Sequence, residues 1–245
     1  MIPLFKSHYS IGRSILTLEE ATGKHRDRSI FHLAQEGGLK DVVLVEDSLI
    51  GFLRARQGAE EYGLNLRFGL RLSISNHPNE EEECRHKVII FAKDSIGCKK
   101  LNQIYSNAFV KNGGVAEENF LRETWSDKHL KLAIPFYDSF IFNNTMLFAS
   151  CTPDLSFTKP TFFIEDNGLP FDGLITEEVE LYCERNKLST EEVKSIFYNK
   201  QEDFSAYQSY KCICNRGFKA RTLQVPNFDH QGSDQFSFES WQELC

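Results

Sequence analysis

The sequence contains no long apolar run that is free of charge. Met1 is followed almost directly by Lys6, and the chain shows no signal-peptide pattern, so we expect a cytoplasmic protein that is neither secreted nor embedded in a membrane. An excess of positive charge is also missing, because 28 Lys and Arg face 35 Asp and Glu and the formal net charge is -7. Tight autonomous binding to nucleic acid needs a clustered excess of cations, so we expect only indirect contact with DNA, although a local basic patch stays open.

Paired cysteines at metal-binding spacing are absent as well. The seven cysteines are an odd number, scattered through a chain too large to need disulfide bonds, and we expect them to be reduced. No C-x-x-C pair and no His pair at zinc-finger spacing occurs, which argues against a structural zinc site. A G-x-S-x-G motif and a P-loop are also missing, which leaves no support for a serine nucleophile or a glycine-rich phosphate loop.

Three short apolar runs in the first third of the chain each end in charged residues. They are Ile2–Phe5 before Lys6, residues 42–45 before Glu46 and Asp47, and residues 68–70 before Arg71. Helical patterns separate the three runs, and in β/α repeats the chemistry lies at the C-terminal ends of the strands. A mixture of cations and carboxylates at those ends is not an ordinary metal site, because Lys and Arg repel a divalent ion.

Apolar runs and amphipathic stretches continue to alternate, which predicts one α/β domain over residues 1–245, and the order of the first three strands implies right-handed parallel crossovers. Further strands are predicted at 40–45, 66–74, 87–92, 131–136, 160–165 and 194–198, and helices at 19–36, 48–62, 96–109, 119–121 and 177–186. Residues 140–148 are apolar but ambiguous, and 205–214 fit a helix or a strand. The acidic run 80–83 is expected to be a solvated loop, and the tail 218–245 a loop that packs on the domain or leads out of it.

Several segments resemble a known family in their order along the chain. They are FKSHYS at 5–10, VLVEDS at 43–48, FGLRL at 68–72, VIIFAK at 88–93 with Gly97 and Leu101, GLP at 168–170, Glu202-Asp203 with Ala206, Cys212-Ile213, and 236–244. Together they resemble the polymerase-and-histidinol-phosphatase (PHP) domain at the N-terminus of bacterial DNA polymerase III alpha subunits, over nearly the whole chain. The resemblance implies a distorted (β/α)7-type barrel with a metal cluster at its C-terminal mouth, held by His, Asp, Glu and sometimes Cys.

The metal-ligand positions that the resemblance assigns mostly hold other residue types in this sequence. Carried over one at a time, they are Leu4 and Lys6, Glu46 and Asp47, Arg71, Lys87 with His86 adjacent, Tyr137, and Ser195 with Phe197. Only Glu46 and Asp47 keep ligand chemistry, and two carboxylates could hold one magnesium or zinc ion weakly. Hydrolysis by a metal cluster needs several ligands, so we expect no catalytic residue and no cofactor in this chain.

Side-chain cations offer a replacement for the missing metal ions. We expect Lys6 and Arg71 to form an ion-pair cluster with Glu46 and Asp47, since unpaired buried charge is strongly unfavourable. Two alternatives stay open. The groups could be solvated around an open mouth, or the cations could bind an anion such as phosphate or a nucleic-acid backbone.

The function implied by the resemblance is that of a catalytically inactive module in DNA replication. In the family this domain packs against the polymerase body and can dock a proofreading exonuclease, so the expected partners are the polymerase body or another replisome protein. One alternative is a metal-dependent phosphoesterase with a reduced site at Glu46 and Asp47, with His8 or His86 recruited as a ligand. Another is a decoy that binds host replication proteins.

Overall fold

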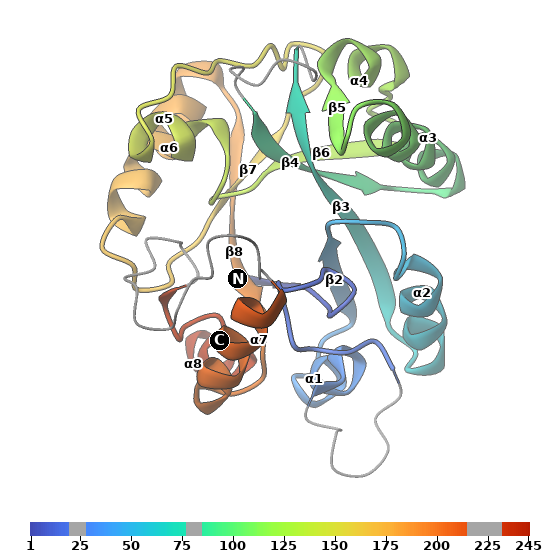
Figure 1. The fold of residues 1–245 in the computed structure, drawn as a ribbon, viewed down its shortest axis with the longest axis vertical. Helices are drawn as coiled ribbons and strands as arrows, with labels where there is room; N and C mark the ends of the chain where they lie inside the picture. Colours follow the sequence, from blue (N-terminus) through green and yellow to red (C-terminus); the bar gives the residue numbers. More distant parts are fainter. Residues whose placement is uncertain (20–27, 77–84, 215–231) are drawn as a thin grey trace.

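Seven strands form a closed, distorted barrel in the computed structural model, which describes residues 1–19, 28–76, 85–214 and 232–245 (Figure 1). The strands of the ring are β1 (Ile2–Phe5), β2 (Asp41–Glu46), β3 (Asn65–Ser75), β4 (His86–Ala92), β6 (Leu130–Ile134), β7 (Thr161–Ile164) and β8 (Ser189–Ile196). Their order is β2-β1-β8-β7-β6-β4-β3, and β3 closes the ring by pairing with β2. A short strand, β5 (Val115–Glu117), pairs with the end of β3 outside the ring. The predicted α/β class with a seven-stranded distorted barrel is therefore confirmed.

One strand of the ring runs against the others, whereas β1, β2 and β3 are parallel, as predicted for the first three strands. β4 is antiparallel to both β3 and β6, whereas the other neighbours in the ring are parallel. The sequence between β3 and β4 contains no helical pattern, and a parallel neighbour needs a long crossover connection, usually a helix. Consequently the first residues of β4, His86 and Lys87, lie at the same end of the barrel as the last residues of the parallel strands.

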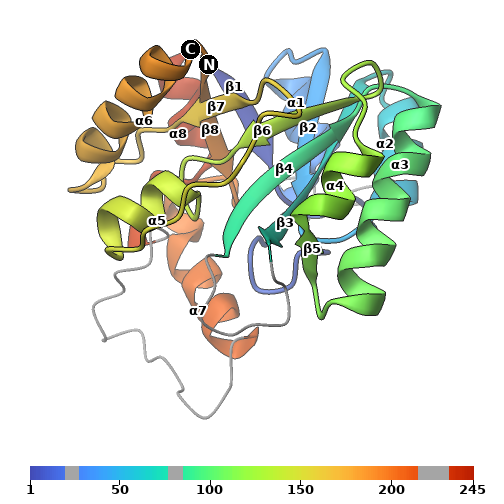
Figure 2. The ribbon, with the colours of Figure 1, turned by 90° about the horizontal axis from the view of Figure 1, so that it is seen from above.

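Helices cover the outside of the barrel. They are α1 (Ile30–Glu36), α2 (Phe52–Glu61), α3 (Ser95–Ser106) with the π-helical turn η2 (Asn107–Lys111), α4 (Glu118–Thr124), α5 (Phe140–Met146), α6 (Asp172–Asn186), the 3-10 turn η3 (Gln201–Asp203), α7 (Phe204–Cys214) and α8 (Phe238–Leu244). In Figure 2, α2, α3 and α4 lie along one side of the strands, and α5 and α6 along the other. The ambiguous segments 140–148 and 205–214 thus contain helices. The predicted helix 19–36 is present only as α1, and residues 20–27 lie outside the described part.

The two faces of each strand meet different surroundings, because side chains alternate along a strand. Outward-facing residues such as Phe5, Leu44 and Leu70 pack in the main core with the helices. Inward-facing residues form a smaller apolar cluster inside the barrel, with Leu4, Val43, Val45, Ile89, Ala133, Phe163 and Val193. Full burial of each large aliphatic side chain contributes about 1.5–3 kcal/mol to stability. The barrel interior is therefore a packed core.

The C-terminal residues from 232 pack on the barrel, as one of the two predictions for the tail has it, but residues 238–244 form a helix where a loop was predicted. Phe236 and Phe238 are 0% and 1% exposed, and both belong to the main core. The indole Nε1 of Trp241 donates to the Met1 carbonyl oxygen at 3.3 Å, which holds α8 beside the start of β1 (Figure 1). The polar residues around these aromatic side chains suggested a loop, but burial of the rings outweighs that composition. The rest of the tail, 218–231, and the acidic run 80–83 lie outside the described residues.

Cysteine chemistry differs from the expectation at one position. Cys151 is disulfide-bonded, so the prediction of a fully reduced chain is wrong for this residue. The free thiols among the described residues are Cys98, Cys183, Cys212, Cys214 and Cys245.

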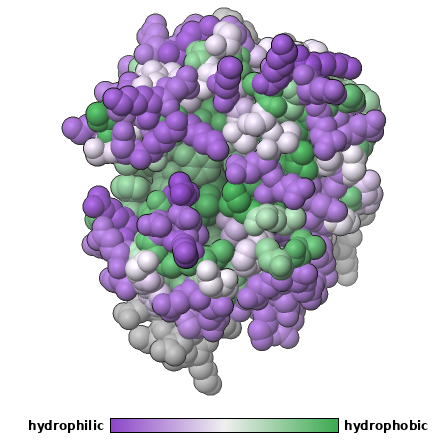
Figure 3. Space-filling model, turned by 180° about the vertical axis from the view of Figure 1, so that it is seen from behind, coloured by the Kyte–Doolittle hydropathy of each residue, from purple (hydrophilic) through white to green (hydrophobic). Residues whose placement is uncertain are grey.

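The surface is mostly hydrophilic on the rear face of the molecule. Figure 3 shows apolar side chains gathered in a hollow near the centre of that face, with polar side chains around them. Within the described ranges, the chain has no helix with the length and apolar character needed to cross a membrane.

Two seams of the barrel have short ladders. β6 pairs with β7 only through Ala133 opposite Thr161 and Ile134 opposite Phe162, and the β1–β2 register is equally short. By contrast, β2 pairs with β3 along its whole length. Fewer ladder bonds leave the β6–β7 seam more dependent on side-chain contacts.

Candidate functional site

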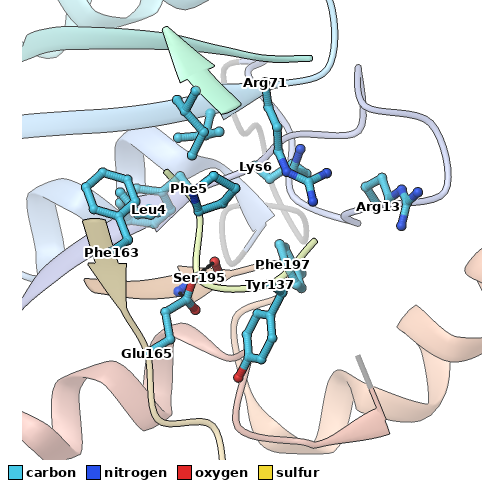
Figure 4. Close-up of a pocket in the computed structure, with 13 residues that line it drawn as sticks. Leu4, Phe5, Lys6, Arg13, Arg71, Tyr137, Phe163, Glu165, Ser195 and Phe197 are labelled. Carbon is cyan, nitrogen blue, oxygen red and sulfur yellow. Dashed lines mark hydrogen bonds between the residues drawn. The ribbon is translucent and has the colours of Figure 1, made fainter. Parts of the chain in front are cut away.

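A pocket lies at the mouth of the barrel, where the strands end (Figure 4). Its floor is apolar and is formed by Leu4, Val45, Ile89 and Phe163, which also belong to the barrel interior. The other lining residues are Phe5, Lys6, Arg13, Arg71, Pro135, Tyr137, Glu165, Ser195 and Phe197. Charged side chains reach this pocket because they follow inward-facing residues at intervals of two, as Lys6 follows Leu4.

Lys6 and Arg71 meet the same carboxylate at the mouth. Lys6 Nζ donates to Asp47 Oδ1 at 2.9 Å, and Arg71 Nη1 lies 3.6 Å from that oxygen. Arg71 Nη2 also donates to Asp138 Oδ2 at 2.5 Å. Because Lys6 is only 6% exposed, its ammonium group depends on Asp47 for a counterion. The expected contact of both cations with Asp47 is present, and Asp138 extends it.

Burial and charge oppose each other in these ion pairs. Burial alone would raise the pKa of Asp47, but Lys6 and Arg71 outweigh it and hold that pKa well below its usual range. Burial lowers the pKa of Lys6 in spite of Asp47. Burial would also lower the pKa of Arg71, but Asp138 and Asp47 overcome it and raise that pKa. Asp47 is therefore ionised at neutral pH and holds both cations at the mouth.

Glu46 does not join this cluster, which corrects that part of the prediction. Adjacent strand residues point to opposite faces, so Glu46 faces outward where Asp47 faces inward. The backbone N of Ser7 donates to Glu46 Oε1 at 2.8 Å, and the Ser10 hydroxyl donates to Glu46 Oε2. Burial raises the pKa of Glu46, and the nearby Lys6 and the two serines offset this only in part. With the two carboxylates on opposite faces, they do not form a pair that could hold one magnesium or zinc ion between them.

A second buried carboxylate, Glu165, lies across the pocket from Arg71 (Figure 4). Ser195 donates to it twice, from its backbone N at 3.0 Å and from Oγ at 2.9 Å. Asn167 Nδ2 donates to Glu165 Oε2 at 3.1 Å and to the Tyr137 hydroxyl at 3.0 Å. Tyr137 and Ser195 thus belong to a hydrogen-bonded wall of the pocket. Burial raises the pKa of Glu165, and its donors offset that rise only in part.

His86 and Lys87 point to different sides of β4, as neighbouring strand residues do. His86 is buried away from the mouth with Nδ1 3.7 Å from Cys151 Sγ, and burial lowers its pKa to about 4. Lys87 is half-buried on the mouth side, where burial and then Arg71 lower its pKa. Neither His86 nor His8 lines the pocket, so neither supplies the ligand that a reduced phosphoesterase site would recruit.

The residues at the mouth do not fit the metal cluster that the family resemblance implies. Leu4 belongs to the apolar floor, and the Phe197 ring packs on Phe236 at a centroid distance of 5.1 Å. Lys6 and Arg71 are cations and repel a divalent ion. In the ranges that the structure describes, no group of three or more His, Cys, Asp or Glu side chains is placed to hold a metal ion.

Three charged members of the mouth were missed by the sequence patterns. Asp138 follows β6 and Glu165 follows β7, so each carried the signal that identified Asp47, a charged residue just after an apolar run. Arg13 lies in the loop after β1 and reaches the pocket through the path of that loop, which gave no pattern to read.

Fold and site together define an α/β barrel with a pocket and a set of ion pairs at its mouth. No family model matches the chain, and no curated protein matches it. Among solved structures, the chain is similar to the crystal structure of a "putative metal-dependent phosphoesterase" from Bifidobacterium adolescentis, with 18% sequence identity and a TM-score of 0.29. The match covers 44% of this chain and 34% of the other, so the chain spans about a third of that protein's length. At this level of similarity the match says nothing about function.

Proposed function

We propose that this chain is a catalytically inactive PHP-like domain, acting as a structural and protein-interaction module of a C-family replicative DNA polymerase. The observation that carries the proposal is the set of ion pairs at the mouth, in which Lys6 and Arg71 pair with Asp47 and Asp138. Metal-dependent phosphoester hydrolysis requires several ligands that hold ions to generate hydroxide and stabilise the leaving oxygen. Cations at two of those positions support a scaffold without a reaction.

The proposed partners are the polymerase body, another replisome protein and a proofreading exonuclease. This choice rests on the family resemblance, since the family domain packs on the polymerase and can dock such an exonuclease. The formal net charge of -7 supports contact with proteins over direct contact with DNA. A closed barrel with a packed interior supports the role of a rigid platform.

Metal analysis of the purified chain tests the proposed inactivity. We expect no stoichiometric zinc, manganese, magnesium or iron after dialysis, no hydrolysis of p-nitrophenyl phosphate above the blank, and no change in Tm with a chelator. Stoichiometric metal together with hydrolysis that Glu46→Ala abolishes would support a phosphoesterase instead. Asp41→Ala on the same strand removes an exposed carboxylate and is the matched control.

Light scattering tests the proposed partner. The chain is mixed with a C-family polymerase chain that lacks its own N-terminal PHP domain. We expect one complex with the summed mass of the two proteins. Two separate species at micromolar concentrations would contradict the proposed association, and the result does not depend on whether the mouth binds metal.

A further inference from the structure

Two cations at the barrel mouth form no ion pair with any of the described residues. Arg13 lines the pocket, and Lys87 stands at the start of β4 on the mouth side. Over the described residues, neither side chain forms an ion pair or a side-chain hydrogen bond, whereas Lys6 and Arg71 are both paired. Both uncompensated cations are partly buried. A charge that is partly removed from water without a partner is unfavourable, and an anion would relieve it.

The cations act on one another electrostatically. Burial is the largest cause of the lowered pKa of Lys87 and Arg71 is the next; Asp47 and Asp138 oppose this shift only in part, and Arg13 lowers the pKa further. Arg13 also helps to lower the pKa of Asp47. Arg13 is therefore within electrostatic range of both Lys87 and Asp47, so the two unpaired cations belong to the same site as the ion pairs.

The carboxylates of the mouth do not balance this charge. Asp47 and Asp138 offset Lys6 and Arg71, which leaves the two unpaired cations in excess. Glu165 faces the pocket, but both of its oxygens accept hydrogen bonds from neighbouring donors, and burial favours its neutral form. The barrel mouth, counted with Lys87 beside the pocket, therefore has an excess of positive charge in a chain whose formal net charge is -7.

The mouth has more N–H donors than its ion pairs use. Figure 4 shows Lys6 and Arg71 together on the side of the pocket across from Glu165, with Arg13 further out on that same side. An arginine carries five N–H donors and a lysine three. Arg13 uses none of its side-chain donors in the described contacts, and Lys6 uses one, on Asp47. Several N–H donors therefore remain for an oxyanion with three or more oxygens.

We propose that the mouth binds a phosphate group, either inorganic phosphate or the terminal phosphate of a nucleotide or nucleic-acid end. Arg13 and Lys87 donate to its oxygens, and Lys6 and Arg71 add positive charge behind them. The arginine fork matches phosphate geometry, and a dianion matches the charge of the two unpaired cations. The site uses only cations of this chain, so it is independent of the proposed association with a polymerase.

Isothermal titration with inorganic phosphate at constant ionic strength tests the site. We expect saturable binding with a Kd in the millimolar range or tighter, which Arg13→Gln and Lys87→Met each weaken about tenfold, as for the loss of a hydrogen bond to a charged group. Arg56→Gln removes an exposed cation on α2 that pairs with Glu60, and it should change the Kd less than twofold. Since Arg13 and Lys87 make no described ion pair, both variants should fold, and an unchanged Tm verifies this. Absence of saturable binding, or equal binding by wild type and both mouth variants, would overturn the proposal.

Oligonucleotides separate the two sources of the phosphate group. A short single-stranded DNA with a 5′-phosphate is compared with the same DNA without it. Binding at least fivefold tighter for the phosphorylated end, lost in Arg13→Gln, identifies a nucleic-acid end as ligand. Equal binding of the two oligonucleotides, with phosphate still bound, identifies inorganic phosphate.

Discussion

Asp47→Asn is the substitution that most directly tests the ion-paired mouth. It keeps the size of the side chain but removes the counterion of Lys6, which is 6% exposed. Removing one partner of a fully buried pair costs about 3–5 kcal/mol, and the Asp47 side chain is 33% exposed, so we expect about 2–3 kcal/mol. An upper limit follows from deprotonation of Lys6. Neutralising at pH 7 a lysine with an ordinary pKa of 10.5 costs about 4.8 kcal/mol.

Urea denaturation at pH 7 measures this loss in the free energy of unfolding. Asp41→Asn is the control, because it breaks the exposed pair with Arg67 and should cost less than about 0.5 kcal/mol. Adding Lys6→Met to Asp47→Asn removes the stranded ammonium group and should recover at least about 1 kcal/mol. If Asp47→Asn unfolds like the control, or if Lys6→Met gives no recovery, the mouth is not held by this ion pair.

The pH dependence of the same experiment has a definite sign. The pKa of Asp47 is lower in the folded chain than its ordinary value of 3.8, because Lys6 and Arg71 outweigh burial. A group with a depressed folded pKa contributes stability above its unfolded pKa, and that contribution is lost as the pH falls through the folded pKa. Wild type should therefore lose stability more steeply than Asp47→Asn below about pH 4. If the free energy of unfolding falls equally steeply with decreasing pH in the two proteins, this prediction is contradicted.

Three further substitutions test other parts of the molecule. Burial raises the pKa of Glu165, so ionisation of Glu165 opposes folding as the pH rises above the ordinary pKa of 4.5. Glu165→Gln can keep its hydrogen bonds to Ser195, so its free energy of unfolding at pH 8 should match or exceed that of the wild type. A large loss in urea denaturation would contradict this. Gly97→Ala places a Cβ 2.2 Å from the His129 carbonyl oxygen and should lower the free energy of unfolding by about 1–3 kcal/mol. Gly173→Ala, with no atom within 4 Å of its Cβ, should raise it by about 0.5–1 kcal/mol in the same assay.

The strands were predictable where both faces are buried. Residues 66–74 and 87–92 were predicted closely, because β4 has a buried β-branched centre and β3 has buried apolar residues at alternate positions. The first half of β8 was missed, since Ser189, Thr190 and Glu192 are exposed and carry no apolar pattern. The direction of β4 was also missed. Direction depends on the connection, and a strand's own residues do not encode it.

The alternation of side chains along each strand predicts only those site residues that lie on or next to a strand. Lys6 and Arg71 could be placed together, because Lys6 directly follows β1 and Arg71 lies within β3, both on the inward face. The same alternation places Glu46 and Asp47 on opposite faces of the strand. The sequence alone could therefore have excluded Glu46 from the expected cluster of four residues. The position of Arg13 could not be predicted, because a loop without a repeating pattern gives its side chains no fixed direction.

The short β6–β7 ladder affects how the barrel moves. Where the backbone gives few bonds, the Tyr137 hydroxyl donates to Asp172 at 2.9 Å and accepts from Asn167 at 3.0 Å, so side chains from either side of the seam hold it together. Local opening requires fewer bonds to break there than along the full β2–β3 ladder. Amide hydrogen exchange should therefore be faster on the side of β7 that faces β6 than along the β2–β3 ladder. The pocket thus lies in a barrel whose wall opens locally more easily at the β6–β7 seam than at the β2–β3 seam.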